Sequence, residues 1–182
     1  MNRNELLGLI TVQNLVLLIL SFGWLWFFPN PQLLGDIRFE ARLLWSLPVA
    51  VGLLVAGALA IRWIPALRAA HQFLDHEIFR HLLPSDGLYL GLLTGVAEEL
   101  MFRGLLQNAW GLLPASLCFG VLHLPGLRHW AYAVWATLMS LVLGGLYLLT
   151  DNLLLVMLVH IINNTLALVL WPRMRKWYRE EV

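Results

Sequence analysis

Residues 88–110 read LYLGLLTGVAEELMFRGLLQNAW, an apolar stretch interrupted by three charged side chains. A bilayer core is about 30 Å thick and a helix that spans it needs about 20 apolar residues, so this stretch is long enough to cross. A charge at the bilayer centre costs roughly 2.5–3.5 kcal/mol on insertion scales. Glu98, Glu99 and Arg103 must therefore face one another or a wet cavity. The stretch predicts both a membrane helix and a buried polar site.

The whole chain has the composition of a membrane protein. Of its 182 residues, 60% are apolar and 13% are charged, against roughly 45–50% and 25% in soluble domains. The mean hydropathy is +0.74. These values exclude a soluble enzyme, a disordered chain and a fibrous protein. The net charge of +1 argues against nucleic acid as a partner, and the lone Cys118 allows no internal disulfide.

Further apolar stretches predict an all-α, polytopic membrane helical bundle. Four of them are long enough to span a bilayer: 6–28, 43–61, 131–149 and 152–171. A shorter stretch, 112–124, is ambiguous between a full crossing and a re-entrant piece, and we expect it to cross. The mixed stretch 62–83 predicts an amphipathic helix that lies in the interface. We expect about six spans plus one interfacial helix in a single membrane domain, residues 1–182.

The distribution of basic residues predicts which side of the membrane each end of the bundle faces. With six spans, most of the Lys and Arg residues lie on the side that holds both chain ends, and the opposite side holds only Arg38 and Arg42. Membrane proteins carry their excess of Lys and Arg on the cytosolic side. We therefore expect both termini to be cytosolic.

The polar residues of the apolar segments occur at helical spacing. Residues four apart share one face of a helix, and three pairs have this spacing: Glu99 and Arg103, Phe119 and His123, and His160 and Asn164. Glu98 is rotated about 100° from Glu99, so Arg103 can hold one glutamate while the other points elsewhere. A carboxylate and one imidazole can activate a water, while a second imidazole and an amide can donate hydrogen bonds to an oxyanion. These groups are the parts of a hydrolytic site.

A structural explanation competes with this hypothesis. A Glu–Arg pair can simply lock two membrane helices together, and Asn or His can join spans by hydrogen bonds. For any one residue the two explanations are about equally good. All three pairs together favour a functional site, because ionisable groups inside a membrane usually serve function.

Three short motifs occur in order along the second half of the chain. Residues 98–103, EELMFR, match E-E-x-x-x-R; residues 119–123, FGVLH, match F-x-x-x-H; and residues 160–164, HIINN, match H-x-x-x-N. Each motif alone is weak, but all three in this order on hydrophobic segments are a strong signal. The pattern resembles the CPBP family of CAAX-protease and bacteriocin-processing proteins, also called the ABI family, with its Rce1-like branch. The resemblance covers a motif-bearing core, residues 88–170.

The resemblance implies a role for each matched residue. Glu98 would be the general base, and His123 would help it to bind and activate the attacking water. His160 and Asn164 would form the oxyanion hole. The other matched residues would support the site: Glu99, Arg103 and Phe119.

Zinc is the alternative that the resemblance leaves open. Glu98, His123 and His160 would be its ligands in an open three-ligand site. The resemblance favours a glutamate mechanism with no required cofactor. A separate run, HEIFRH at residues 76–81, is similar to the zinc signature H-E-x-x-H. Its histidines are five residues apart instead of four, so they point away from each other on a helix. We expect these two histidines, and His71 five residues before them, to be interfacial.

The predicted function is therefore that of an intramembrane endopeptidase. The resemblance implies a peptide or lipidated-protein substrate, either a prenylated CAAX protein or a bacteriocin-type peptide, and a bacterial plasma membrane. Two other functions stay open. One is a non-catalytic member, a bacteriocin-immunity or membrane-scaffold protein with the same fold, and the other is a small transporter or proton relay.

Overall fold

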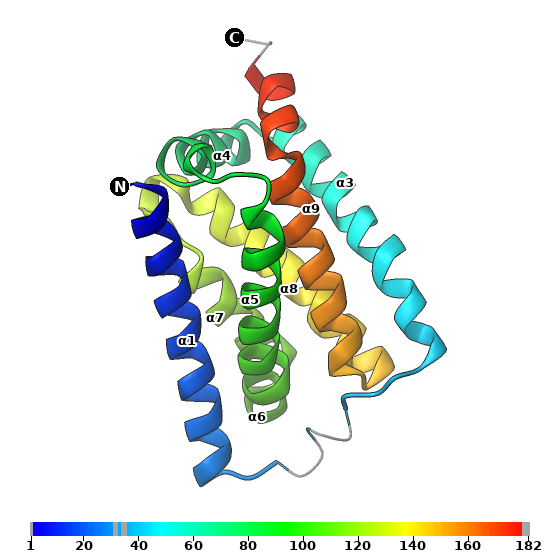
Figure 1. Ribbon diagram of the computed structural model, residues 1–182. Helices are drawn as coiled ribbons and strands as arrows, with labels where there is room; N and C mark the ends of the chain where they lie inside the picture. The colour runs from blue at the N-terminus through cyan, green and yellow to red at the C-terminus, as the bar shows by residue number, and fades with distance from the viewer. Residues whose placement is uncertain (1, 31–32, 34–35, 180–182) are drawn as a thin grey trace.

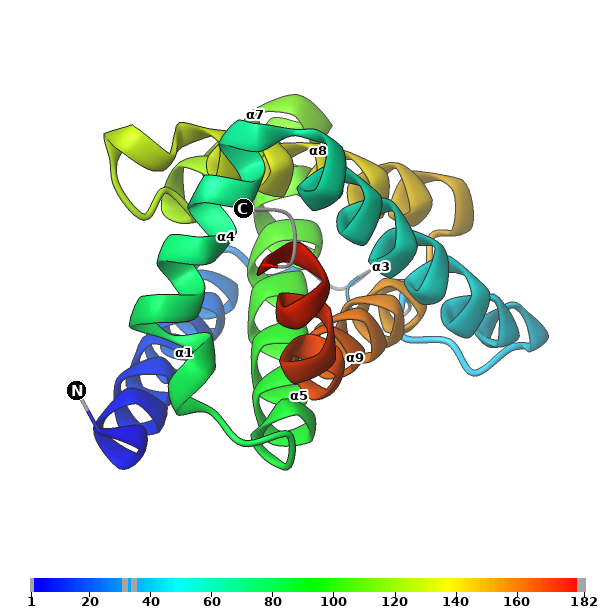
Figure 2. The same ribbon diagram turned by 90° about the horizontal axis from the view of Figure 1, so that it is seen from above.

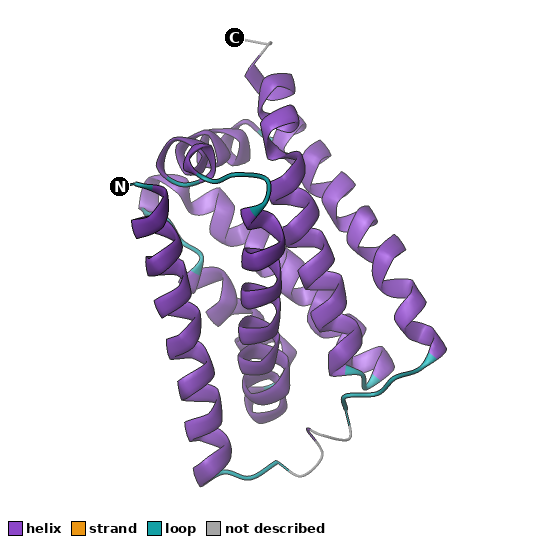
Figure 3. Cartoon of the chain, viewed as in Figure 1, coloured by secondary structure: helices purple, strands orange, loops and turns teal. Residues whose placement is uncertain are grey.

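The computed structural model describes residues 2–30, 33 and 36–179, and this part of the chain contains helices and loops but no strand (Figures 1 and 3). The all-α prediction is thus confirmed. The α-helices are α1 (Arg3–Phe27), α3 (Ser46–Trp63), α4 (Pro65–Glu77), α5 (Asp86–Glu99), α6 (Asn108–Trp110), α7 (Leu112–Leu122), α8 (Trp130–Thr150) and α9 (Leu153–Arg179). The tighter 3₁₀ turns are η1 (Ala41–Trp45), η2 (Phe79–His81) and η4 (Leu127–His129), and the wider π-helical segment is η3 (Leu100–Gln107).

Four helical stretches of the described chain are long and apolar enough to cross a membrane. They are Arg3–Phe27, Ala41–Trp63, Leu127–Thr150 and Leu153–Lys176. The other two predicted spans differ from these. Residues 86–110 form a continuous helical rod that carries the charged residues, whereas α7 has 11 residues. An α-helix of that length rises only about 16 Å, roughly half of the hydrocarbon core.

The central rod changes its winding immediately after Glu99. The α-helical hydrogen bonds of α5 give way to the π-helical segment η3, which continues through α6 without a break in the rod. Such π-helical segments are rare and are frequent at functional sites. The apolar stretch 88–110 predicts a single ordinary helix here. The change of winding is therefore a feature that hydrophobic periodicity did not show.

Small residues let α5 approach α9 closely. The two helices lie side by side in both views (Figures 1 and 2). A Cβ added at Gly91 would lie 2.9 Å from the backbone nitrogen of Thr165, and one added at Gly95 would lie 2.6 Å from Cγ1 of Ile161. Close approach of backbones through small residues is the usual way in which helices associate in membranes. The glycines therefore set the distance between the two helices that carry most of the polar residues.

Helix α4 lies across one end of the bundle, as the predicted interfacial helix would (Figures 1 and 2). Its buried face anchors it to α9, because Asp75 accepts a hydrogen bond from Nε1 of Trp171 at 2.5 Å and lies 3.8 Å from Nη1 of Arg175. Pro65 begins the helix at a position where a missing N–H costs nothing.

One histidine of this region is buried, contrary to the expectation that all of them are interfacial. His76 is exposed and bonds to Glu77, but only 9% of His71 is exposed. The ring of His71 packs against Tyr132 and Trp171, with centroids 5.3 and 6.1 Å away. Its Nδ1–H donates to the carbonyl of Leu67, and burial lowers the pKa of His71 to about 4.

The opposite end of the bundle is held by the chain between α1 and α3. Tyr147 donates a 2.6 Å hydrogen bond to Asp36. Asn152, at the start of α9, donates to the carbonyl of Arg38 and to the carboxylate of Glu40. These bonds join the connecting segment to α8 and α9.

Substitution of the glycines tests the close helix contact. We expect Gly95→Ala to lower the free energy of unfolding by about 1–3 kcal/mol, because the added methyl group overpacks the contact with Ile161. Apparent melting temperature in detergent is the measurement. Gly52→Ala is the matched control, since a Cβ there meets none of the described atoms within 4 Å. Equal shifts in melting temperature for the two variants would contradict this account.

The buried imidazole predicts a pH dependence of stability. The pKa of His71 is about 4 in the folded protein against 6.5 ordinarily, so the unfolded chain binds more protons between these values. The contribution of the neutral His71 ring to the free energy of unfolding is complete above pH 6.5. It falls by up to about 3 kcal/mol as the pH drops towards 4. We expect His71→Phe to flatten the plot of melting temperature against pH over this window. The exposed control His76→Phe should leave the plot unchanged, and a steep plot in both variants would refute the prediction.

Candidate active site

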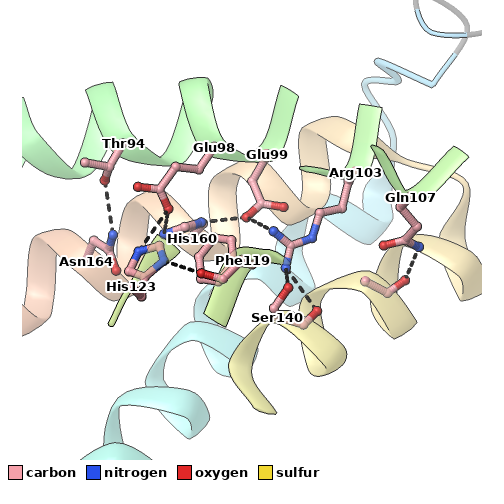
Figure 4. A network of polar contacts seen from close by, with 11 residues as sticks. Thr94, Glu98, Glu99, Arg103, Gln107, Phe119, His123, Ser140, His160 and Asn164 are labelled. Carbon is pink, nitrogen blue, oxygen red and sulfur yellow. Dashed lines mark hydrogen bonds and ion pairs between the residues drawn. The ribbon is translucent and has the colours of Figure 1, made fainter. Parts of the chain in front are cut away.

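Glu99 is the buried centre of a network that joins three helices (Figure 4). Its side chain has no exposed surface, and its Oε1 accepts hydrogen bonds from Nη1 of Arg103 at 3.0 Å and from Nδ1 of His160 at 2.6 Å. Among the described residues its other oxygen, Oε2, has no hydrogen-bond partner. The i,i+4 spacing thus produced the expected Glu99–Arg103 pair, and the bond to His160 adds α9 to it.

Arg103 connects the same network to α8. Its Nη2 donates to both the carbonyl oxygen and the hydroxyl of Ser140, each at 3.0 Å. One turn further along, Gln107 donates to the carbonyl of Gly144 at 2.9 Å, and a Cβ at Gly144 would collide with that amide. A buried charge is tolerated only when it is paired and hydrogen-bonded. These bonds satisfy that requirement for Arg103, of which 1% is exposed.

Glu98 faces away from Arg103 and towards two imidazoles. Its Oε2 lies 3.8 Å from Nε2 of His123 and 3.8 Å from Nε2 of His160 (Figure 4). These separations are too long for direct hydrogen bonds, but they leave room for a water that donates to Glu98 and to one of the two imidazole nitrogens. Glu98 is also less buried than Glu99, with 13% of its side chain exposed. The two adjacent glutamates therefore have different surroundings.

The partners of each histidine determine which ring nitrogen faces Glu98. The Nδ1–H of His123 donates to the carbonyl of Phe119 at 2.8 Å, and the Nδ1–H of His160 donates to Glu99. In the singly protonated ring, Nε2 is then an acceptor in both cases. Phe119 stacks on His123 with ring centroids 4.1 Å apart and lies beneath the guanidinium of Arg103 at 5.3 Å. Phe119 thus contacts both His123, which faces Glu98, and Arg103, which pairs with Glu99.

Asn164 lies one turn beyond His160 on α9. Its Nδ2 donates to the hydroxyl of Thr94 at 3.1 Å, and its Oδ1 accepts from Asn163 at 3.2 Å. Thr94 precedes Glu98 by one turn of α5. Sequence reasoning missed Thr94 and Ser140, because a hydroxyl residue in an apolar helix gives no signal until its neighbour on another helix is known.

A cavity of about 290 Å³ lies beside these residues. Thr94, His123, His160 and Asn164 line it, and most of its other lining residues are apolar. One stripe of α9 runs along it: His160, Asn163, Asn164, Ala167, Leu168, Trp171 and Met174. Trp171 follows His160 by eleven positions, which correspond to about 16 Å of helix. The cavity therefore leads from the imidazoles towards the end of the bundle that α4 covers.

The donor set of the site resembles a zinc site in chemistry but not in arrangement. Glu98, His123 and His160 offer one oxygen and two nitrogens, and Glu99 orients His160 as carboxylates orient zinc-bound histidines. However, within the described ranges no group of three or more His, Cys, Asp or Glu side chains is placed to hold a metal ion. We therefore assign no step of the chemistry to a metal.

The structure brings all the matched motif residues into one region. Glu98, Glu99 and Arg103 come from the central rod, Phe119 and His123 from α7 and its end, and His160 and Asn164 from α9 (Figure 4). Glu99 and His160, which are hydrogen-bonded to each other, are 61 residues apart in the sequence. Their convergence is what three interacting motifs require.

Comparison with known proteins agrees with the motifs. Residues 81–166 match the family described as Type II CAAX prenyl endopeptidase Rce1-like. The chain is also 32% identical over 154 residues to the uncharacterised protein YpbD of Bacillus subtilis (strain 168), covering 82% of this chain and 81% of that protein. No solved structure matches the chain. The chain therefore belongs to the Rce1-like CAAX prenyl endopeptidase family, and this membership implies a protease embedded in a membrane.

Proposed function

We propose that the protein is an intramembrane endopeptidase in which Glu98 activates a water to hydrolyse a peptide bond. One observation carries the proposal: Oε2 of Glu98 lies 3.8 Å from Nε2 of both His123 and His160. A water held among these atoms has a carboxylate to take its proton and an imidazole nitrogen to orient it.

The positions of the side chains support one order of steps. The water oxygen attacks the peptide carbonyl carbon while Glu98 takes one of its protons. The oxyanion that forms accepts hydrogen bonds from Asn164 and from Nε2 of His160. This second bond requires a doubly protonated His160, because its Nδ1–H is already directed at Glu99. The carbon–nitrogen bond then breaks, and the proton held by Glu98 passes to the leaving amine.

Glu99, Arg103 and Phe119 support the site in this proposal without contacting the reacting atoms. Glu99 holds the ring of His160 through Nδ1, Arg103 holds Glu99, and Phe119 fixes the ring of His123. Buried networks of this kind rigidify a site when their members are satisfied.

The apolar wall of the cavity favours a substrate that carries an apolar group next to its scissile bond. A peptide with a lipid-modified residue has this chemistry, and a CAAX-type prenylated protein is one example. Most of the wall beyond the imidazoles is formed by apolar side chains, among them Leu53, Ala58, Trp135, Met139 and Leu168. Burying apolar surface there contributes to binding in proportion to the area removed from water.

We also propose that both chain ends lie on the cytosolic side of a bacterial plasma membrane. The start of α1, helix α4 and the end of α9 lie at one end of the bundle (Figure 1). That end also holds most of the basic residues, whereas Arg38 and Arg42 precede α3 at the other end. This distribution agrees with the positive-inside rule.

The two alternatives explain less of the site. A scaffold or immunity protein needs helix contacts but has no use for two imidazole nitrogens directed at one carboxylate beside a cavity. A proton relay would use the carboxylates but gives no purpose to Asn164 and its neighbours. A cleavage assay separates the protease from both alternatives, because only a protease yields product and loses it with Glu98.

Glu98→Gln keeps the shape of the side chain and removes the base. We expect cleavage of a quenched farnesylated CAAX peptide, or of another membrane-associated peptide in a panel, to fall by about 10²–10⁴-fold. Glu77→Gln, on the exposed part of α4, is the control and should keep full activity. A zinc chelator should leave the wild-type rate unchanged. Wild-type cleavage by Glu98→Gln would refute the mechanism, and loss of activity with the chelator that zinc restores would support the metal alternative.

Filling the cavity tests the proposed place of the apolar group. Ala58 and Ala56 are both on α3, but Ala58 lines the cavity and Ala56 is exposed on the outer face. We expect Ala58→Phe to raise KM for a lipid-modified peptide by about tenfold, a loss of about 1.4 kcal/mol in binding, and Ala56→Phe to leave it unchanged. An unchanged KM in both variants would place the apolar group elsewhere.

A further inference from the structure

The contact between α5 and α9 carries two polar contacts one helical turn apart. At one level Glu98 and Glu99 face His160, and at the next Thr94 faces Asn164 (Figure 4). The spacing is four residues on each helix, and the residue numbers rise on one helix as they fall on the other, as expected for antiparallel neighbours. The glycines of α5 hold the two helices close enough for short side chains such as threonine to reach across.

The amide of Asn164 is held at both of its polar atoms. Its Oδ1 accepts from Asn163 at 3.2 Å, and its Nδ2 donates to Oγ1 of Thr94 at 3.1 Å. An amide nitrogen carries two hydrogens. Thr94 accepts one of them, so the second can donate to another acceptor. All three residues line the same cavity as His123 and His160.

The hydroxyl of Thr94 bonds to a side chain of a neighbouring helix. Threonine hydroxyls within helices commonly bond to the carbonyl four residues earlier, and Thr11, Thr137 and Thr150 of this chain do so at 2.7–2.9 Å. The contact of Thr94 instead crosses to α9. Threonine in a helix can adopt two χ1 rotamers, and the one seen here directs the hydroxyl to Asn164.

We propose that Thr94 is a positioning residue of the active site. Its hydroxyl accepts a hydrogen bond from one N–H of the Asn164 amide. This bond orients the amide so that its second N–H is directed at the oxyanion that forms during hydrolysis. This inference rests on the proposed function. Thr94 does not contact the reacting atoms and acts only through Asn164. One face of α5 therefore carries both the base that activates the water and the group that orients the oxyanion donor.

The first experiment compares Thr94→Val with Thr94→Ser. Valine has the shape of threonine without the hydroxyl, so we expect kcat to fall by about tenfold with KM unchanged, less than the 10²–10³-fold lost when an oxyanion donor is removed outright. Serine keeps the hydroxyl and should restore most of the rate. Thr150→Val is the matched control, because it removes a helical hydroxyl bond far from the cavity. A wild-type kcat in Thr94→Val would overturn the proposal.

A double-mutant cycle tests whether Thr94 acts through Asn164. In an Asn164→Ala background the amide is absent, so Thr94→Val should cost nothing further. Equal losses with and without the amide would overturn the proposal, since they would show an effect independent of Asn164. A general loss of stability would also appear in both backgrounds and in the melting temperature.

A spectroscopic measurement separates this inference from the proposed function. In protein labelled with ¹⁵N-asparagine, the side-chain signal missing from Asn164→Ala identifies the Asn164 amide. We expect the chemical shifts of its two hydrogens to converge in Thr94→Val and to stay apart in Thr94→Ser. An unchanged signal in Thr94→Val would overturn the inference, whatever the activity. Cleavage that does not depend on Glu98 would refute the proposed function while this signal still reports on the contact.

Discussion

The carboxylate of Glu99 is the contact on which the arrangement of this bundle depends. One oxygen accepts from Arg103 of the same rod and from His160 of α9, and Arg103 continues the network to Ser140 of α8. In a bilayer there is no water to satisfy these groups if a helix shifts. The free-energy cost of leaving these groups unpaired therefore fixes three helices relative to one another. The residues one turn before and after Glu99 are positioned by the same network.

The adjacent glutamates illustrate how one helix can place two carboxylates in different surroundings. Because successive residues point about 100° apart, Glu99 is directed into the packed interior and Glu98 towards the imidazoles. Glu99 is bonded directly to a guanidinium at 3.0 Å, whereas the nearest ring nitrogens lie 3.8 Å from Glu98. A carboxylate that is not already occupied by a strong partner is the one suited to accept a proton from water.

Much of the fold and site could be predicted from the sequence, for identifiable reasons. Apolar length indicated the long helices, and the spacing of Glu99 and Arg103 indicated their pair, because both properties are local. The π-helical winding after Glu99, the burial of His71 and the contacts of Thr94 and Ser140 could not be predicted. Each depends on which surface of a distant helix lies opposite, and a single sequence with many apolar positions does not contain that information.

The helical winding of the central rod limits which insertions and deletions the sequence can tolerate. Thr94, Glu98, Glu99, Arg103 and Gln107 each meet a fixed partner on α8 or α9. Adding or deleting one residue between any two of them would rotate everything beyond it by about 100° and break several contacts at once. Point substitutions can be absorbed one at a time, but changes in length cannot. Among relatives of this chain, differences in length should therefore be confined to the loops and the outer helices.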